Sequence, residues 1–313
     1  MPKLTLPKTL SIKLHKFADL RYGENPHQKS AFYLEDVKNP GFELLSGIPL
    51  SHNNLGDANH AWRLVCDFGK PTVAIIKHGN PSGIASRNNL AHAFSHAYGA
   101  DTVSAFGGII AVNEPPSMEM VEKMSGIFFE LLVAPDYSPE VLERLKKRSQ
   151  KMRVVKAQKP PGLLEFTRVF NGYLIQTPDN IVEPKSKWKV VSGRVASEQT
   201  WKDLEFCWKV VKHVKSNAIV IAKNECLLGM GTGQPNRVNS VKLSLSQAKG
   251  KAHGAVLASD AFFPFADNVE IAARAGIAVI IQPGGSINDE AVIAAAKKYR
   301  MTMVFTGVRH FKH

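Results

Sequence analysis

The sequence predicts an α/β protein made of two domains, and three observations lead to this prediction. Short β-branched runs alternate along the chain with amphipathic segments at helical spacing. The length of 313 residues exceeds what one hydrophobic core usually organises. A proline-rich stretch over residues 156–189 interrupts the alternation near the middle. We therefore predict a lead-in over residues 1–19, a first domain over residues 20–185 and a second domain over residues 186–313.

In the first domain, the alternation places helices and strands around a few loops. We expect helices over residues 57–68, 91–98, 117–124 and 139–150, and strands over residues 73–76, 109–112, 127–133, 152–155 and 172–176. Residues 20–28 and 47–54 are predicted loops. The first of these loops is dense in directional hydrogen-bonding groups, so it is either a binding loop or a solvated connector.

One stretch of the first domain joins a buried strand to polar side chains. Lys77 and His78 follow the β-branched strand over residues 73–76, and residues 79–83 (Gly-Asn-Pro-Ser-Gly) predict a tight loop. Ligands of open α/β sheets bind outside the carboxyl ends of the strands. A cation beside an imidazole suits acyl transfer, because one can stabilise an oxyanion while the other takes up a proton. An exposed Lys-His pair without a function is the alternative.

The second domain repeats the strand, turn and helix pattern. We expect helices over residues 197–216, 268–275 and 289–299, a hairpin of strands over residues 218–222 and 226–230, and further strands over residues 254–259, 277–281 and 301–306.

Three polar or aromatic segments of this domain are candidates for binding. The glycine-rich loop over residues 229–237 leads to a helix and ends at Arg237, which predicts either an anion site or a structural turn. The loop over residues 260–268 holds three phenylalanines between two aspartates, so it either walls an aromatic ligand or belongs to the core. The tail over residues 307–313 is either frayed or tucked into a site.

The composition is typical of a soluble globular protein. Hydrophobic residues make up 44% of the chain and charged residues 21%. No apolar run is long enough for a membrane span, and the N-terminus lacks the apolar core of a signal peptide. We therefore expect a cytoplasmic protein without a membrane partner. Cys66, Cys207 and Cys226 are isolated, which argues against a disulfide framework and a Cys-rich zinc site.

The formal net charge of +13 requires an anionic partner or a solvated basic surface. The basic residues are scattered, apart from a cluster over residues 146–153 that ends a predicted helix. No aromatic signature of an RNA-binding domain is present. We therefore favour an acidic small-molecule substrate and expect no nucleic-acid partner.

Taken together, the motifs follow one another in a recognisable order. They are Arg21-Tyr22-Gly23 with residues 25–28, Lys77-His78 with residues 80–83, Ser104 with Phe106-Gly107, Lys215-Ser216-Asn217, Gly231 with Gly233-Gln234 and Arg237, residues 259–265 with Asp267-Asn268, residues 282–286, and Arg309-His310-Phe311. From about residue 20 to residue 313, the sequence resembles the AICAR transformylase domain of the bifunctional purine-biosynthesis family.

This resemblance implies a fold, an assembly and a reaction. The fold would be two cytidine-deaminase-like three-layer α/β/α domains, assembled as a homodimer with active sites at the subunit interface. The reaction would move a formyl group from 10-formyltetrahydrofolate to the 5-amino group of AICAR, giving FAICAR and tetrahydrofolate. A structural potassium ion is a further implied ligand.

The resemblance also assigns roles to residues that match the motifs. His78 would be the general base, Lys77 would stabilise the oxyanion, and Asn217 would hold the carboxamide of AICAR. The nucleotide-binding positions would be Arg21, Tyr22, Gly107, Glu130, Arg237, Phe262 and Arg309. The folate pocket would be formed by Phe106, Pro264, Phe265, Asp267 and Asn268.

The sequence departs from the family pattern in several places. Only about twenty residues precede the match, so we expect no cyclohydrolase activity and a separate IMP cyclohydrolase as partner. Glu130 stands where some members have Asp, and Ala266 replaces a common arginine. The H-x-E and P-C-x-x-C motifs of zinc deaminases are absent, which excludes that chemistry. Two alternatives remain: the same fold with another formyl donor, or a non-catalytic basic protein that binds nucleotides or RNA.

Overall fold

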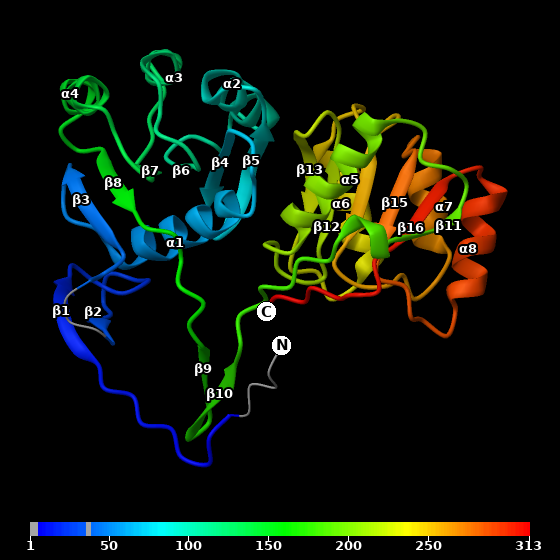
Figure 1. The fold of residues 1–313 in the computed structure, drawn as a ribbon, viewed down its shortest axis with the longest axis horizontal. Coiled ribbons are helices and arrows are strands. Elements are labelled where there is room, and N and C mark those ends of the chain that lie inside the picture. Colours follow the sequence, from blue (N-terminus) through cyan, green and yellow to red (C-terminus); the bar gives the residue numbers. More distant parts are fainter. Residues whose placement is uncertain (1–5, 36–38) are drawn as a thin grey trace.

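The computed structural model describes residues 6–35 and 39–313 and shows an α/β protein with two six-stranded sheets. Figure 1 shows the sheets as two lobes, with the C-terminus between them. Residues 1–5 of the predicted lead-in lie outside the described part of the chain. The predicted α/β class is confirmed, and the cytidine-deaminase-like relationship stays a prediction.

The first sheet has the strand order β3-β8-β7-β6-β4-β5. Its strands are β3 (Phe42–Ser46), β4 (Thr72–Lys77), β5 (Asn80–Ser86), β6 (Ile109–Val112), β7 (Leu131–Ala134) and β8 (Arg153–Ala157). Strands β6, β7 and β8 run parallel, whereas β3 and the β4–β5 hairpin pair antiparallel to their neighbours. We call residues 42–157 the first half.

The second sheet has the order β11-β16-β15-β14-β12-β13. Its strands are β11 (Lys189–Ser192), β12 (Ile219–Ala222), β13 (Leu227–Gly231), β14 (Val256–Ser259), β15 (Val279–Gln282) and β16 (Thr302–Phe305). Parallel and antiparallel pairs occur at the same places as in the first sheet. We call residues 189–305 the second half. The chain therefore contains one topology twice, and the predicted boundary at residue 185 falls between the two halves.

Helices cover both faces of each sheet. In the first half, α1 (His52–Cys66) packs on one face, and α2 (Leu90–Ala100), α3 (Met118–Lys123) and α4 (Pro139–Arg148) pack on the other. In the second half, α5 (Glu198–Val211) lies opposite α6 (Arg237–Gln247), α7 (Asp267–Arg274) and α8 (Asp289–Lys298). Strand β4 shows why both faces are apolar: Val73 and Ile75 point to one core, and Ala74 and Ile76 to the other.

One hydrophobic core joins the two halves. Side chains of α1 and α5 belong to the same buried cluster, together with the facing sides of both sheets. The rings of Phe68 and Phe206, which come from different halves, lie 5.4 Å apart. Each fully buried aliphatic or aromatic side chain contributes about 1.5–3 kcal/mol to stability. The halves therefore stabilise each other and are not independent lobes.

Two short hairpins lie outside the sheets. One pairs β1 (His15–Leu20) with β2 (Ser30–Leu34), and the other pairs β9 (Glu165–Val169) with β10 (Gly172–Gln176). Figure 1 shows β9 and β10 projecting below the first sheet. A short 3₁₀ helix over Lys185–Lys187 precedes β11. Of these elements only β10 was predicted: β1 lies mostly in the predicted lead-in, and no strand was predicted over β2 or β9.

The prediction for residues 79–83 was wrong, because this segment is not a loop. Only His78 and Gly79 form the turn, and Asn80 already begins β5. The backbone φ angles of His78 (+51°) and Gly79 (+72°) suit a two-residue hairpin turn. Pro81 is tolerated because β5 is an edge strand and the register shifts beside it. The glycine and proline signals therefore marked a hairpin rather than a loop.

Several element boundaries also differ from the prediction. Helix α1 begins at His52 instead of residue 57, because Ser51 and Asn54 form a capping box that starts the helix earlier. The helix predicted over residues 197–216 ends at Val211, and the strand predicted over residues 127–133 is reduced to β7. Most other predicted helices and strands agree within a few residues. Over residues 6–35 and 39–313, no helix is long and apolar enough to cross a membrane.

Candidate active site

The β4–β5 turn places Lys77 and His78 at the end of the first sheet. The carboxylate of Asp57, in α1, accepts hydrogen bonds from the backbone N–H groups of His78 (3.1 Å) and Gly79 (2.7 Å). These bonds stabilise the left-handed conformation of His78, which is unfavourable for a residue with a Cβ atom. The backbone of His78 is therefore held by α1 as well as by the strands.

The ammonium group of Lys77 lies beside the loop that connects α2 to β6. Its Nζ donates to the backbone carbonyl of Phe106 at 2.6 Å. The ring of Phe106 is 60% exposed and packs 5.4 Å from the ring of Phe128. Gly107 has a φ angle of +69°, and its N–H donates to the carbonyl of Phe128. The structure thus brings a predicted catalytic residue, Lys77, next to two predicted binding residues, Phe106 and Gly107.

A second group of predicted residues surrounds Arg153, which the sequence analysis missed. The carboxylate of Glu130 lies 3.7 Å from the guanidinium of Arg153 and accepts a hydrogen bond from Asn54. Burial lowers the pKa of Arg153, while Glu130 raises it and Arg21 lowers it, so these charges act on one another. Arg21 also lies over the ring of Tyr22, at 5.6 Å. A single arginine in an apolar strand was the available signal for Arg153.

A cavity of about 450 Å³ in the second half collects the largest set of predicted residues. Eight of them line it: Asn217, Arg237, Phe262, Pro264, Phe265, Asp267, Asn268 and Arg309. They come from four separate segments of the chain, which the sheet and α6 hold together. Predicted nucleotide-binding and folate-binding positions therefore share one wall. The other predicted residues, which lie on the first half or before it, do not line this cavity, so the predicted residues fall into a first-half group and a second-half group.

Buried hydrogen bonds fix the polar side of this cavity. Arg237 is buried and forms an ion pair with the buried carboxylate of Asp260. Its second terminal nitrogen donates to the side-chain carbonyl of Asn217 at 2.6 Å, and the amide of Asn217 donates to the backbone carbonyl of Gln234 at 2.7 Å. The carboxamide of Asn217 is therefore oriented before any ligand arrives. Since Asp260 neutralises Arg237, Arg309 is the more available cation of this wall.

The C-terminal tail is tucked into the site. Arg309 lines the cavity and lies over the ring of Phe311, at 4.3 Å. His310 is buried between the carboxylates of Asp179 (2.6 Å) and Glu183 (3.0 Å). Burial opposes the charge of His310, but the two carboxylates outweigh it and raise the pKa of His310 to about 9. This charged cluster fastens the tail to the segment that connects the halves.

Known proteins were compared with the chain. A family profile described as "AICARFT/IMPCHase bienzyme" matches residues 2–247. The chain belongs to this family. Proteins named "Bifunctional purine biosynthesis protein PurH" are similar to it: one from Bacillus cereus is 47% identical and one from Bacillus anthracis 48% identical, each over 98% of this chain. The chain spans 61% of the length of these relatives.

A solved structure of RibD from Acinetobacter baumannii covers 35% of the chain and 36% of its own, with 16% identity and a TM-score of 0.27, and no argument depends on it. The two halves also contact each other next to the β4–β5 turn. The hydroxyl of Thr232 donates to the side-chain carbonyl of Asn80 at 3.0 Å, so the glycine-rich loop of the second half contacts the β4–β5 hairpin.

The sequence analysis also missed a basic cluster at the junction of the halves. His60 of α1 lies near Gly79, and its Nε2 is 2.8 Å from the carbonyl of His213. The ammonium of Lys312 is 3.2 Å from both of these groups. Burial, aided by Lys312 and His213, lowers the pKa of His60 to about 3, and burial lowers the pKa of Lys312 to about 8. The tail therefore reaches the base of the β4–β5 turn.

Proposed function

We propose that this chain transfers a formyl group from 10-formyltetrahydrofolate to the 5-amino group of AICAR, producing FAICAR and tetrahydrofolate in purine biosynthesis. One observation carries the proposal: eight residues that the family motifs assign to the two substrates line a single cavity. Membership of the AICARFT/IMPCHase bienzyme family supports it. The basic net charge of +13 suits two anionic substrates.

In the proposed mechanism, the amine nitrogen of AICAR attacks the formyl carbon. His78 removes the proton from the attacking amine, and Lys77 stabilises the oxyanion that forms on the formyl oxygen. The bond between the formyl carbon and N10 of the folate then breaks, and N10 takes a proton. Asp57 contributes indirectly, because it holds the backbone on which His78 is mounted.

The proposed binding roles follow the two groups of residues. Asn217 holds the carboxamide of AICAR, and Arg309 provides a cation for the phosphate. The ring of Phe265, which is 63% exposed at the cavity, gives the folate a surface for stacking. Arg21, Tyr22, Gly107 and Glu130 complete the nucleotide site from the other group. Because the amine of AICAR is a poor nucleophile, the orientation of the two substrates must supply much of the rate enhancement.

We also propose a homodimer in which a partner subunit brings the two groups of residues together. The β9–β10 hairpin supports this proposal, because Phe170, Tyr173 and Leu174 at its tip and edge are largely exposed. Further exposed apolar side chains lie on the N-terminal segment that precedes β1, at Leu6, Leu10, Ile12 and Leu14. Sedimentation measurements test the assembly: a concentration-independent mass of a single chain would contradict it.

Other parts of the sequence-based hypothesis remain proposals. We place the protein in the cytoplasm and assign closure of FAICAR to IMP to a cyclohydrolase outside these 313 residues. The potassium ion is not assigned to residues: the described chain contains no group of three or more His, Cys, Asp or Glu side chains suited to a metal. Potassium would instead require carbonyl and hydroxyl oxygens.

The decisive experiment incubates the purified 313-residue chain with AICAR and 10-formyltetrahydrofolate. We expect tetrahydrofolate release and a nucleotide with the mass of FAICAR, without IMP. Turnover only with another formyl donor would favour the alternative suggested by Ala266. This residue is the N-cap of α7 and forms no side-chain cap hydrogen bond. Salt-sensitive RNA binding without any turnover would favour the non-catalytic alternative.

A further inference from the structure

The repeated topology gives the β4–β5 turn a structural equivalent in the second half. Asn224 and Glu225 form the two-residue turn of the β12–β13 hairpin, with φ angles of +53° and +51°. The carboxylate of Asp203 accepts hydrogen bonds from both of their backbone N–H groups, at 2.9 and 2.7 Å. Asp203 is the sixth residue of α5, as Asp57 is the sixth of α1.

The lysine before each turn is also equivalent. Lys77 donates to the carbonyl of Phe106 in the loop between α2 and β6. Lys223 donates to the carbonyl of His253, at 2.9 Å, in the corresponding loop between α6 and β14. A lysine and a connecting loop therefore frame both hairpin turns in the same way. Lys223, Asn224 and His253 of the second arrangement line a cavity that contains none of the predicted site residues.

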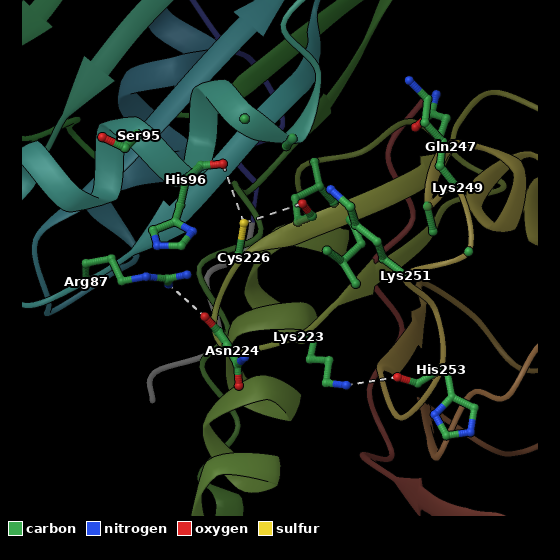
Figure 2. A pocket seen from close by; sticks show the side chains of 16 residues that line it. Arg87, Ser95, His96, Lys223, Asn224, Cys226, Gln247, Lys249, Lys251 and His253 are labelled. Atoms are coloured by element: carbon green, nitrogen blue, oxygen red, sulfur yellow. Dashed lines mark hydrogen bonds between the residues drawn. The ribbon is translucent and has the colours of Figure 1, made fainter. Parts of the chain in front are cut away.

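This second cavity has a volume of about 660 Å³ and is lined by both halves (Figure 2). Its basic side chains come from three stretches that are far apart in the sequence: Arg87, His96, Lys223, Lys249, Lys251 and His253. The lining includes no Asp or Glu. Volumes of this size are typical of small-molecule sites and exceed what one phosphate group fills.

Three nearby carboxylates have partners outside this lining, so they neutralise it only in part. Asp203 accepts from the turn, Glu225 forms an ion pair with Lys70 at 2.8 Å, and Asp101 accepts from the backbone of Ser104 at 3.0 Å. In the described part of the chain, the lysines and the arginine of the cavity form no ion pair with a carboxylate. An anion would therefore relieve repulsion between cations that the fold holds together.

Two of these cations are held in place. Nη1 of Arg87 donates to the carbonyls of Ser86 (2.6 Å) and Asn224 (2.7 Å), and Figure 2 shows Lys223 bonded to His253. Burial raises the pKa of the Cys226 thiol at the cavity floor, and Arg87 and Lys251 oppose this rise, so both cations lie within range of the floor. Such preorganised cations lose little freedom when they bind a ligand.

We propose that this cavity binds a small polyanion carrying at least two phosphate groups. Arg87 and His96 of the first half contact one end of the ligand, and Lys223, Lys249 and Lys251 of the second half contact the other. Asn224 stands where the first turn has His78, so the turn itself presents an amide instead of an imidazole. The proposal does not depend on the formyltransferase function.

The test uses tripolyphosphate as the probe and the full 313-residue chain. Calorimetry is expected to show one tripolyphosphate bound per chain, with an affinity that falls between about 50 and 200 mM salt. Hydrogen exchange is expected to slow over residues 223–228 and 247–253. Absence of binding at the lower salt concentration would overturn the proposal, and so would protection confined to residues 306–311 around Arg309.

A pair of double variants locates the site. Lys249→Glu/Lys251→Glu is expected to weaken tripolyphosphate binding about tenfold or more, because two attractive charges become repulsive. Lys297→Glu/Lys298→Glu is the matched control, since it reverses two exposed lysines at the end of another helix, α8. Equal losses in both variants would overturn the proposal, as would unchanged binding in the first.

Two further measurements control for misfolded variants. Thermal unfolding checks that both variants are folded, and Lys249→Ala/Lys251→Ala replaces the first variant if charge reversal prevents folding. The alanine variant is expected to weaken binding in the same direction by a smaller factor. Tight binding of single-stranded RNA without binding of tripolyphosphate would overturn the assignment of a small ligand.

Discussion

The hairpin turns of the two halves are built alike but carry different side chains. In each half, an aspartate at the sixth position of a helix accepts both N–H groups of a left-handed turn. The first turn presents His78, and the second presents Asn224. The comparison teaches that the same backbone scaffold can present different side chains: an imidazole in the first half and an amide in the second.

The close packing behind both turns is also shared. Gly83 in β5 and Gly229 in β13 stand at equivalent positions, and a Cβ atom there would lie 1.9 Å from the carbonyl oxygen of Ala97 or 2.2 Å from that of Ser244. Only glycine therefore allows α2 and α6 to approach the hairpins this closely. The repeat is maintained by such steric requirements rather than by overall sequence similarity.

The largest expected effect separates the chemistry of the two turns. His78→Ala is expected to lower formyl transfer by a factor of about 10²–10⁴, because the general base is lost while the turn remains. Tetrahydrofolate release measures the rate, and calorimetry with AICAR checks that binding persists. His92→Ala, an exposed histidine of α2, is the control. A His78 variant as fast as the parent would remove His78 from the mechanism.

The next effect concerns the polar residues that follow two equivalent strands, β6 in the first half and β14 in the second. Asn113 follows β6 and forms hydrogen bonds with backbone groups. Asp260 follows β14, and Arg237 balances its buried charge. Arg237→Leu is expected to destabilise the protein by about 3–5 kcal/mol, because it leaves Asp260 buried and unpaired. Urea unfolding measures the change. Arg237→Leu/Asp260→Asn is expected to recover much of it; a double variant as unstable as the single one would contradict this account.

A third pair of variants compares the two aspartates directly. Asp57→Asn and Asp203→Asn are each expected to cost about 1.5–3 kcal/mol of stability, since each weakens two hydrogen bonds to a charged acceptor. Only Asp57→Asn is expected to reduce kcat, by about tenfold, because it alone positions His78. Equal reductions of kcat in both variants would show that the aspartates act through stability and not through positioning.

The smallest effect concerns the charged cluster of His310, Asp179 and Glu183, which fastens the C-terminal tail and which we call the tail clamp. Because the pKa of folded His310 is raised to about 9, its contribution to stability is complete below pH 6.5 and is lost as the pH rises towards 9 and above. We expect the stability difference between the parent and His310→Gln to shrink by about 2 kcal/mol between pH 6 and pH 10. A difference that is constant with pH would contradict the clamp. Comparing two variants cancels the opposite contribution of Lys312, whose lowered pKa favours folding at high pH.

Much of the second half could be predicted from sequence, because its strands are short β-branched runs between clear turn signals. The first half was harder: β3 contains Glu43 and lies at an edge, and the signals in residues 79–83 resemble a loop although they belong to a strand. The repeat itself escaped detection because it leaves few matching residues, such as the helix caps Ser51 and Ser197. Local patterns do not report which distant segments share a topology.

The sequence predicted residues for the candidate site but not the contacts between them. Motifs identified Asn217 and Arg237, yet only the structure shows that Arg237 orients Asn217. Asp57 and Arg153 were missed for a similar reason, because their roles depend on contacts with residues far away in the chain. The second cavity was missed because no single one of its segments is unusual in composition.

The hydrophobic core shared by α1 and α5 has a consequence for how the molecule comes apart. Neither half can open without uncovering the apolar face of the other, so we expect a single cooperative unfolding transition rather than two. A cut in the segment between the halves would leave two fragments that remain associated and melt together. The β4–β5 turn and the second cavity would then persist or be lost together.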